Sequence, residues 1–136
     1  MKKFLKYSAL VLIVAFLIAA CTPGGSEETE TLSVAIVSPS AINDYAFTQS
    51  IYDAMVALQE GLGGEEALEF VYSEGMFVVD DAAAAIRDYA ASGHDLVIAH
   101  GSQYGSSLQE IAPDFPETSF AWGTTVDTFG VDNIFA

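Results

Sequence analysis

Short apolar runs and segments with helical periodicity alternate along the chain. The apolar runs are rich in β-branched and aromatic residues, which is typical of buried strands, and they cover residues 33–39, 68–72, 95–99 and 119–122. Between the runs, apolar residues recur at spacings of three and four in residues 46–62, which predicts a helix there. The alanine-rich stretch 80–92 is also strongly helical, and a short helix is expected at 106–112, before Pro113. Residues 131–135 are expected to begin a fifth strand.

This alternation predicts an α/β fold with parallel strands. Parallel neighbours are joined by right-handed crossovers, so helices should cover both faces of the sheet. We expect a flavodoxin-like sheet with the strand order 2-1-3-4. In such sheets ligands bind beyond the carboxyl ends of the strands, at the point where the strand order reverses, which here lies between the first and third strands.

The segments that follow the strands carry hydroxyl, amide, carboxylate and aromatic side chains but no Lys or Arg. This chemistry suits a neutral polar ligand with a flat part, because rings stack on aromatic side chains and a carboxylate accepts hydroxyl protons. The candidate ligand-binding residues in these segments are Ser38, Asp44, Phe47, Gly101, Ser102, Gln103 and Tyr104. Asp44 has the alternative role of a helix cap, and Phe47 that of a core residue. His100 is either a ligand contact or a residue with structural partners only.

Charge narrows the class of ligand. The 136 residues include 19 acids and 4 bases, which gives a formal net charge of −15 at pH 7. Three of the bases lie within the first six residues, and Arg87 is the fourth. A nucleic-acid partner is therefore excluded, because its binding requires a basic surface. The hydrophobic share of 51% also excludes a disordered chain.

Residues 1–20 have the pattern of a secretory signal, in which a basic start precedes an apolar run of about 13 residues, too short to span a membrane. Small residues precede Cys21, the only cysteine of the chain. The stretch Ile18-Ala19-Ala20-Cys21 resembles a bacterial lipobox, whose cysteine is lipidated after cleavage. An uncleaved anchor and an ordinary signal with an incidental cysteine are the alternatives. Residues 21–32 are polar and predict a flexible tether before a folded part at 33–136.

No catalytic signature stands out in the sequence. It lacks a G-x-S-x-G elbow, a P-loop, and a G-x-G-x-x-G after the first strand. Its two histidines, His94 and His100, do not have the helical spacing of a zinc pair. We therefore predict a protein that is not an enzyme and that uses no cofactor or metal.

Several motifs together resemble the basic membrane protein family of substrate-binding lipoproteins, also called purine nucleoside receptor-like. After the strand SVAIVSPS, the residues Asp44, Phe47 and Gln49 match the family pattern D-x-S-F-N-Q, with Ala46 and Thr48 in place of its Ser and Asn. The stretch GHDLVIAHG, followed by APDFP and Phe120, is similar to the family patterns G-x-D-x-V-I-x-x-G and A-x-x-Y-P-D-x-x-F. The likeness covers residues 33–136.

The resemblance implies a type I periplasmic-binding-protein fold, with two lobes and a ligand between them. Residues 33–136 would then be the N-terminal lobe of a chain truncated before the second lobe. The expected function is the capture of a nucleoside or related small molecule for an ABC permease, on the extracytoplasmic face of a bacterial cell membrane. The resemblance adds Gln49 to the candidate site and places Asp44 on ribose hydroxyls and Phe47 near the base. A ligand-sensing lipoprotein that partners a signalling receptor is the alternative.

Overall fold

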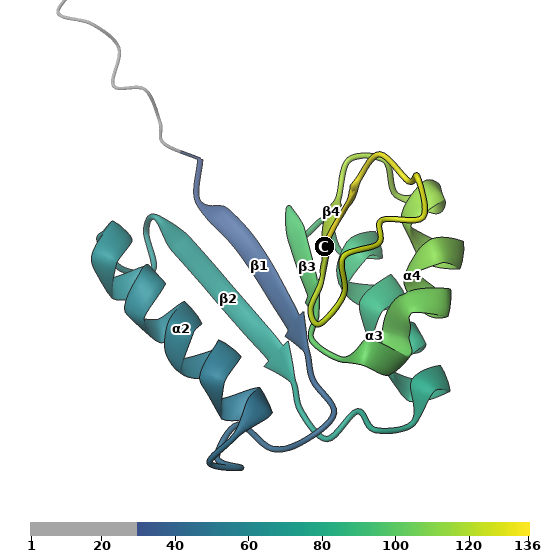
Figure 1. The fold of residues 1–136 in the computed structure, drawn as a ribbon. Helices are drawn as coiled ribbons and strands as arrows, with labels where there is room; N and C mark the ends of the chain where they lie inside the picture. The colour runs from purple at the N-terminus through teal and green to yellow at the C-terminus, as the bar shows by residue number, and fades with distance from the viewer. Residues whose placement is uncertain (1–29) are drawn as a thin grey trace, which may run out of the picture.

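The computed structural model describes residues 30–136, which fold around one parallel sheet (Figure 1). The strand order is β2-β1-β3-β4-β5, and every neighbouring pair is parallel. The strands are β1 (Leu32–Val37), β2 (Leu68–Ser73), β3 (Leu96–Ala99), β4 (Ser119–Trp122) and β5 (Ile134–Phe135). The predicted order 2-1-3-4 is confirmed, and the expected fifth strand forms two residues beside β4.

Helices cover both faces of the sheet, as predicted. Helix α2 lies on one side, while α3 and α4 lie on the other (Figure 1). The helices are α2 (Phe47–Leu62), α3 (Val79–Ala91) and α4 (Gly105–Ile111). Two 3₁₀ turns that the periodicity did not predict flank α4, namely η1 (Ser102–Tyr104) and η2 (Ala112–Asp114).

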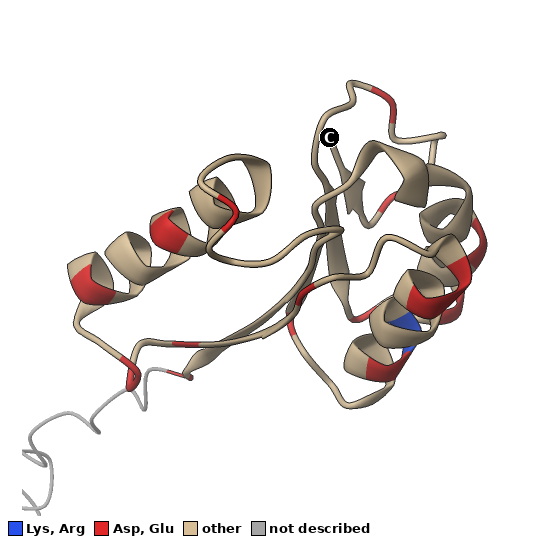
Figure 2. Cartoon of the chain, turned by 90° about the horizontal axis from the view of Figure 1, so that it is seen from below, with Lys and Arg blue, Asp and Glu red and all other residues tan. Residues whose placement is uncertain are grey.

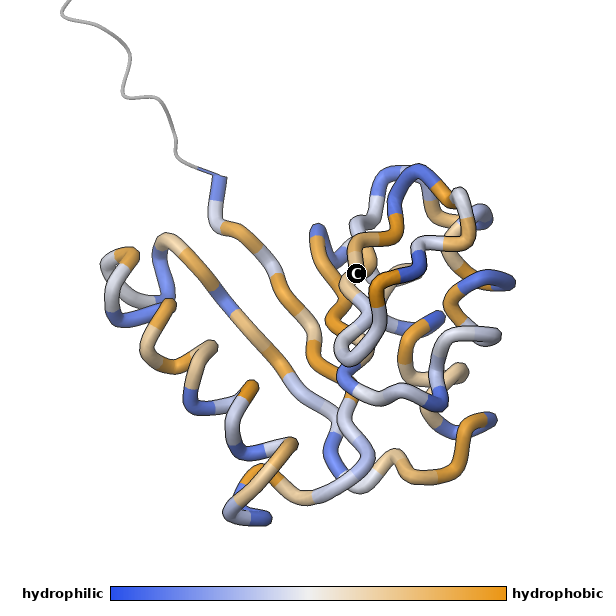
Figure 3. Tube along the Cα trace, viewed as in Figure 1, coloured by the Kyte–Doolittle hydropathy of each residue, from blue (hydrophilic) through white to orange (hydrophobic). Residues whose placement is uncertain are grey.

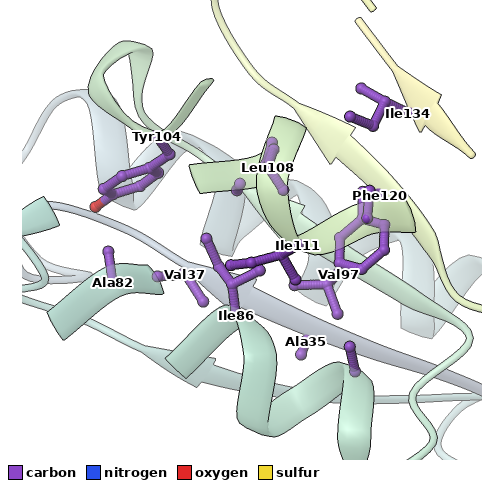
Figure 4. Close-up of a cluster of buried hydrophobic side chains, with 13 residues drawn as sticks. Ala35, Val37, Ala82, Ile86, Val97, Tyr104, Leu108, Ile111, Phe120 and Ile134 are labelled. Carbon is purple, nitrogen blue, oxygen red and sulfur yellow. The ribbon is translucent and has the colours of Figure 1, made fainter. Parts of the chain in front are cut away.

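The alternation of side chains along β1 divides the core into two parts. Ala35 and Val37 face α3 and α4, whereas Val34 and Ile36 face α2. The larger part fills the space between the sheet and the α3–α4 layer (Figure 4). Its buried members are Ala35, Val37, Ala82, Ile86, Ala90, Val97, Ala99, Tyr104, Leu108, Ile111, Ala112, Phe120 and Ile134.

The α2 side of the sheet has the smaller core. Met55 of α2 packs there with Val34, Ile36 and Leu68, and Leu96 and Ile98 of β3 are only partly buried. Within residues 30–136, α2 is the one helix on this side, and it lies over β1 and β2. Figure 3 shows that β1 is hydrophobic along most of its length, whereas the hydrophobic stretch of β2 is broken by a hydrophilic position, as expected for a strand at the edge of the sheet.

One side-chain amide connects the last strand to the rest of the fold. Nδ2 of Asn133 donates hydrogen bonds to the carbonyl oxygens of Ala112, Phe115 and Thr118, at 3.0, 2.9 and 2.9 Å. The backbone carbonyl of the same residue accepts a bond of 2.8 Å from the amide of Phe120 in β4. Asn133 thereby anchors the return from β4 to β5, which contains no helix of its own.

The predicted signal segment, Cys21 and most of the predicted tether lie outside the described residues. Across residues 30–136, the helices are too short and too polar to cross a membrane.

Candidate functional site

The carboxyl ends of the strands meet at one edge of the sheet, and the strand order reverses there between β1 and β3. The loop from Ser38 to Ala46 follows β1, and His100 and Gly101 follow β3. Both segments therefore lie where the sequence predicted a ligand site. Three contacts give this edge its shape: a carboxylate network, a stacked pair of rings, and a tryptophan wedged over α4.

The Asp44 carboxylate organises the loop after β1. Oδ1 accepts hydrogen bonds from the backbone amides of Ala46 (2.8 Å) and Gln49 (3.1 Å). Oδ2 accepts bonds from the amide of Thr48 (3.2 Å) and from the hydroxyl of Ser40 (2.5 Å). The Ser40 hydroxyl also lies 2.7 Å from the Thr48 hydroxyl. Asp44 thus satisfies amides of the first turn of α2, which is the capping role that the sequence left open.

These bonds explain the acidity of the carboxyl group. The Ser40 hydroxyl and the amides of Ala46, Gln49 and Thr48 all stabilise the charged form, and they lower the pKa of Asp44 from 3.8 to about 2, against a smaller opposing effect of burial. The carboxylate therefore stays ionised at any physiological pH and keeps its full capacity to accept hydrogen bonds.

Two rings join the loops of β1 and β3. The Phe47 and His100 rings are stacked, with centroids 3.9 Å apart and planes inclined by 17°. Nε2 of His100 also lies 3.1 Å from the carbonyl oxygen of Phe47. Phe47 remains 37% exposed, so this stack leaves part of its ring open to solvent. The alternative that Phe47 is a core residue therefore does not describe its position.

Burial and the groups of the neighbouring loop shift the pKa of His100 in opposite directions. Desolvation lowers its pKa below the ordinary 6.5, while the bond to the Phe47 carbonyl and the charge of Asp44 partly oppose this shift. The imidazole is consequently neutral near pH 7. Gly123, the first residue after β4, packs against the same ring: a Cβ at this glycine would lie 2.9 Å from Nδ1 of His100.

Trp122, the last residue of β4, lies beside the segment that follows β3. Its Nε1 donates a 3.0 Å hydrogen bond to the Gly101 carbonyl oxygen, and its ring stacks on Phe129 with centroids 5.2 Å apart. The indole lies against Gly105 so closely that a Cβ there would overlap ring atoms Cη2 and Cζ2. The glycine at the start of α4 is therefore required by packing.

The structure corrects the expected position of Tyr104. This side chain is fully buried, and its hydroxyl donates a 2.7 Å bond to the carbonyl oxygen of Met76. Burial raises the pKa of Tyr104 to about 12. A tyrosine in a polar, glycine-flanked segment was expected at the surface, but η1 turns its ring into the core beside Ala82 and Leu108 (Figure 4). Tyr104 is thus excluded from an open cleft.

Ser38 also lies beneath the surface. Its side chain is 2% exposed, and among the described residues its Oγ is the one buried side-chain polar atom without a hydrogen-bond partner. By the alternation of β1 it lies on the α2 side, where Thr48 and Ile51 line a narrow gap that is too small for a water molecule. Ser38 is therefore not part of the open surface at this edge.

The remaining candidates divide between packing and exposed positions. Gly101 is buried, and a Cβ there would lie 2.6 Å from Cε2 of Tyr104. Ser102 is exposed and Gln103 partly so. Oε1 of Gln49 accepts a bond of 3.0 Å from the Tyr45 amide, and its Nε2 lies 3.3 Å from Asp53.

Sequence reasoning missed several members of this edge. The spacing Ser40, Asp44, Thr48 was a visible signal, since residues four apart around a helix start can exchange side-chain hydrogen bonds. His100 was considered, but its partner Phe47 lies 53 residues away, and no local pattern indicates that pairing. The contact of Trp122 with Gly105 is equally non-local.

The charge around the edge is acidic. Figure 2 shows acidic residues distributed over both helical layers. Among residues 30–136 the one Lys or Arg is Arg87, on α3. Arg87 is paired with Asp114 at 2.9 Å, and its guanidinium lies 5.8 Å from the centroid of the Phe115 ring. No three His, Cys, Asp or Glu residues within the described range are grouped to hold a metal ion. The edge is therefore suited to a neutral or cationic ligand.

Comparison with known proteins places these features in context. Residues 31–129 match the family model described as ABC transporter substrate-binding protein PnrA-like. The chain is also 26% identical over 87 residues to the transcriptional activator protein Med of Bacillus subtilis (strain 168), a match that covers 64% of this chain and 26% of Med.

Solved structures give the same picture of the fold. An ABC transporter solute-binding protein from Conexibacter woesei matches 76% of this chain and 34% of its own, with a TM-score of 0.64 and 25% identity. A solute-binding protein from Aeropyrum pernix K1 matches over 76% of this chain and 27% of its own length, with a TM-score of 0.66 and 20% identity. A lipoprotein fragment from Peptoclostridium difficile 630 matches over 75% of this chain and 80% of the fragment, with a TM-score of 0.60 and 22% identity. The chain thus spans about a quarter to a third of the longer relatives.

Proposed function

Because the chain belongs to the PnrA-like family of ABC transporter substrate-binding proteins, as its motifs predicted, we propose that it captures a nucleoside or related neutral ligand for an ABC importer. The lobe described above would supply one wall of the ligand cleft. The family assignment favours binding over catalysis, and we propose no chemical step.

The observation that carries the proposal is the partly exposed Phe47 ring at the point where the strand order reverses. A flat base would stack on this ring, and such contacts contribute roughly 0.5–1.5 kcal/mol beyond the burial of area. The loops around the ring contain no Lys or Arg. The wall therefore favours an uncharged nucleoside over a nucleotide, whose phosphate would meet acidic residues.

Asp44 would accept the hydroxyl protons of the ribose. Its four hydrogen bonds already occupy both oxygens, so a ligand hydroxyl would have to replace a donor. The Ser40 hydroxyl is the natural one to yield, because it retains Thr48 as a second partner. This exchange would let the carboxylate bind ligand without uncapping α2.

The test is saturation-transfer-difference NMR on the full chain, with adenosine, inosine and uridine as neutral probes and AMP as the anionic probe. We expect saturation transfer to the base protons of the nucleosides and a weaker effect for AMP. Phe47→Leu removes the ring and should lower the nucleoside signal several-fold. Phe135→Leu is the matched control, since Phe135 is 57% exposed on β5 at the far edge of the sheet.

Equal nucleoside signals for wild type and Phe47→Leu would show that the Phe47 ring does not contact the ligand. The absence of any nucleoside signal under conditions where the wild-type chain is folded would contradict the proposed function for this lobe.

We further propose that the protein is anchored through Cys21 on the extracytoplasmic face of the membrane. The support is the apolar run that ends in Ile-Ala-Ala-Cys, before the polar stretch 22–32. In a bacterial host, wild type should partition with the membrane fraction after labelling with a fatty-acid analogue, whereas Cys21→Ser should remain unlabelled. Normal labelling and fractionation of Cys21→Ser would refute the anchor.

A sensing role is the second candidate, and the match to the activator protein Med favours it. In that case the same wall would bind a ligand whose capture is transmitted to a signalling partner instead of a permease. Co-purification from cross-linked cells separates the two: a permease and an ATPase support import, and a kinase or regulator supports sensing.

A further inference from the structure

We propose that Nδ1 of His100 is a hydrogen-bond acceptor for the ligand, so that the wall selects ligands that present an N–H or O–H donor beside the Phe47 ring. This inference rests on the proposed function and adds a specificity-determining contact to it. It is carried by the tautomer of His100, by the accessibility of Nδ1, and by the glycine that faces it.

The tautomer follows from the partner of Nε2. The Phe47 carbonyl oxygen can only accept, so the nitrogen 3.1 Å from it must carry the hydrogen. In a neutral imidazole the other nitrogen then has a lone pair. Nδ1 of His100 is therefore an acceptor when the ring is uncharged.

The structure provides no protein partner for this acceptor. Nδ1 makes no hydrogen bond within residues 30–136, yet it is absent from the buried unpaired atoms, of which Ser38 Oγ is the one member there. Solvent therefore reaches it. His94 differs, because its Nδ1 lies 3.0 Å from the Tyr89 carbonyl oxygen and is already used.

Gly123 keeps Nδ1 open. A methyl group at this position would lie 2.9 Å from the nitrogen and cover it. Gly123 has no positive φ, so no conformational demand explains a glycine there. The space in front of Nδ1 is the space that a side chain at position 123 would fill, and it adjoins the ring on which a base would stack.

The charged environment of the ring is simple. Phe47 and Gly123, which contact the ring from α2 and from the segment after β4, carry no ionisable side chain. The charge that acts on it is that of Asp44, in the loop after β1. Protonation of His100 would leave the Nε2 bond intact and would replace the acceptor at Nδ1 by a donor.

The test pairs protein variants with ligand analogues that each lack one donor. The probes are adenosine, purine riboside, 2′-deoxyadenosine and 3′-deoxyadenosine, with dissociation constants from NMR titration of the full chain. Wild type should bind one analogue roughly 2- to 10-fold more weakly than adenosine, the range expected for one hydrogen bond. His100→Phe keeps a stacked ring without the acceptor and should abolish that difference.

Gly123→Ala supplies an independent variant in case His100→Phe does not fold, and it should abolish the same difference by covering Nδ1. Gly61→Ala is its control, because a Cβ at Gly61 meets no atom within 4 Å. Lowering the pH from about 7.5 to about 5 should weaken adenosine binding by wild type more than by His100→Phe.

Two results would overturn the inference while leaving the proposed function intact: wild type and His100→Phe discriminating among the analogues equally, or ¹⁵N NMR showing the proton of neutral His100 on Nδ1. Failure of wild type to bind any of the four nucleosides would instead overturn the proposed function, and this inference with it.

Discussion

The contact between Gly105 and Trp122 predicts that Gly105→Ala destabilises the lobe, although the substitution places a better helix former in α4. The backbone of Gly105 is already right-handed helical, with φ −58° and ψ −45°, so alanine fits the chain conformation. Its methyl group, however, would overlap the indole ring and lie 3.0 Å from Cζ3. The ring is restrained by Phe129 and by the bond to the Gly101 carbonyl oxygen, so it cannot retreat without losing a contact.

The magnitude follows from two opposing effects. Overpacking by one methyl group costs about 1–3 kcal/mol in a restrained site. Replacing glycine by alanine inside a helix returns up to about 1 kcal/mol, and less at the first residue of a helix. We therefore expect the free energy of unfolding to fall by about 1–2 kcal/mol, which corresponds to a decrease in Tm of roughly 5–15 °C for a domain of this size.

The assay is thermal and urea unfolding, followed by circular dichroism and by tryptophan fluorescence. Trp122 is the only tryptophan of the chain, so its emission reports directly on this contact. Displacement of the indole toward solvent should shift the emission of folded Gly105→Ala to longer wavelength. Gly61→Ala, in the last turn of α2, should keep the wild-type emission and raise the free energy of unfolding by a few tenths of a kcal/mol or more.

A double-mutant cycle isolates the contact. In a Trp122→Leu background the methyl group at position 105 has room, and Gly105→Ala should cost less than about 0.5 kcal/mol. Unchanged Tm and emission for Gly105→Ala in the wild-type background would show that the indole is not wedged against α4.

Three further predictions concern single side chains. Ser38→Ala should raise the free energy of unfolding by about 1 kcal/mol in urea, because it removes a buried hydroxyl that has no partner; a loss of stability would reveal a bond from Oγ. Asn133→Ala should lower the free energy of unfolding by about 1–3 kcal/mol, because three carbonyl oxygens lose their donor. An unchanged urea midpoint would show that these bonds do not stabilise the fold. Asp44 has a pKa lowered to about 2, so its stabilisation is complete above about pH 4 and is lost as the pH falls through 2. Asp44→Asn should therefore flatten the acid side of a plot of urea midpoint against pH, and a variant with the wild-type slope would contradict the network.

The sequence predicted the sheet because its strands carry their own signals. The run from Val34 to Val37 is fully buried on both faces, which an uninterrupted apolar run indicates. The glycines after α2 end it where expected, with Gly63 in the left-handed conformation at φ 112°. Strand order followed from the α/β alternation and needed no knowledge of individual contacts.

The site was less predictable because its geometry depends on contacts between distant segments. The candidates were chosen by chemistry and loop position, and both criteria are blind to the direction in which a side chain turns. The Tyr104 ring lies in the core, where its hydroxyl donates to the carbonyl oxygen of Met76, and neither contact has a local sequence signal. Ser38 followed the alternation of β1 under α2, whereas Phe47 kept an exposed face and acquired His100 as a partner.

Because Arg87 is far in sequence from any other Lys or Arg, trypsin can cut the folded part into two defined pieces. After Lys6 the chain offers trypsin one bond, Arg87–Asp88, in the middle of α3, where cleavage requires the helix to open. The cut separates a piece with β1, α2 and β2 from one with β3, α4, β4 and β5. Within the sheet the two pieces meet where β1 pairs with β3, Val34 to Val37 against Leu96 to Ala99. They also meet where the first half of α3 packs against α4 and where Phe47 stacks on His100. The rate of appearance of these two fragments therefore measures how often α3 opens, and their reassociation measures the combined strength of the strand pairing and the core contacts between them.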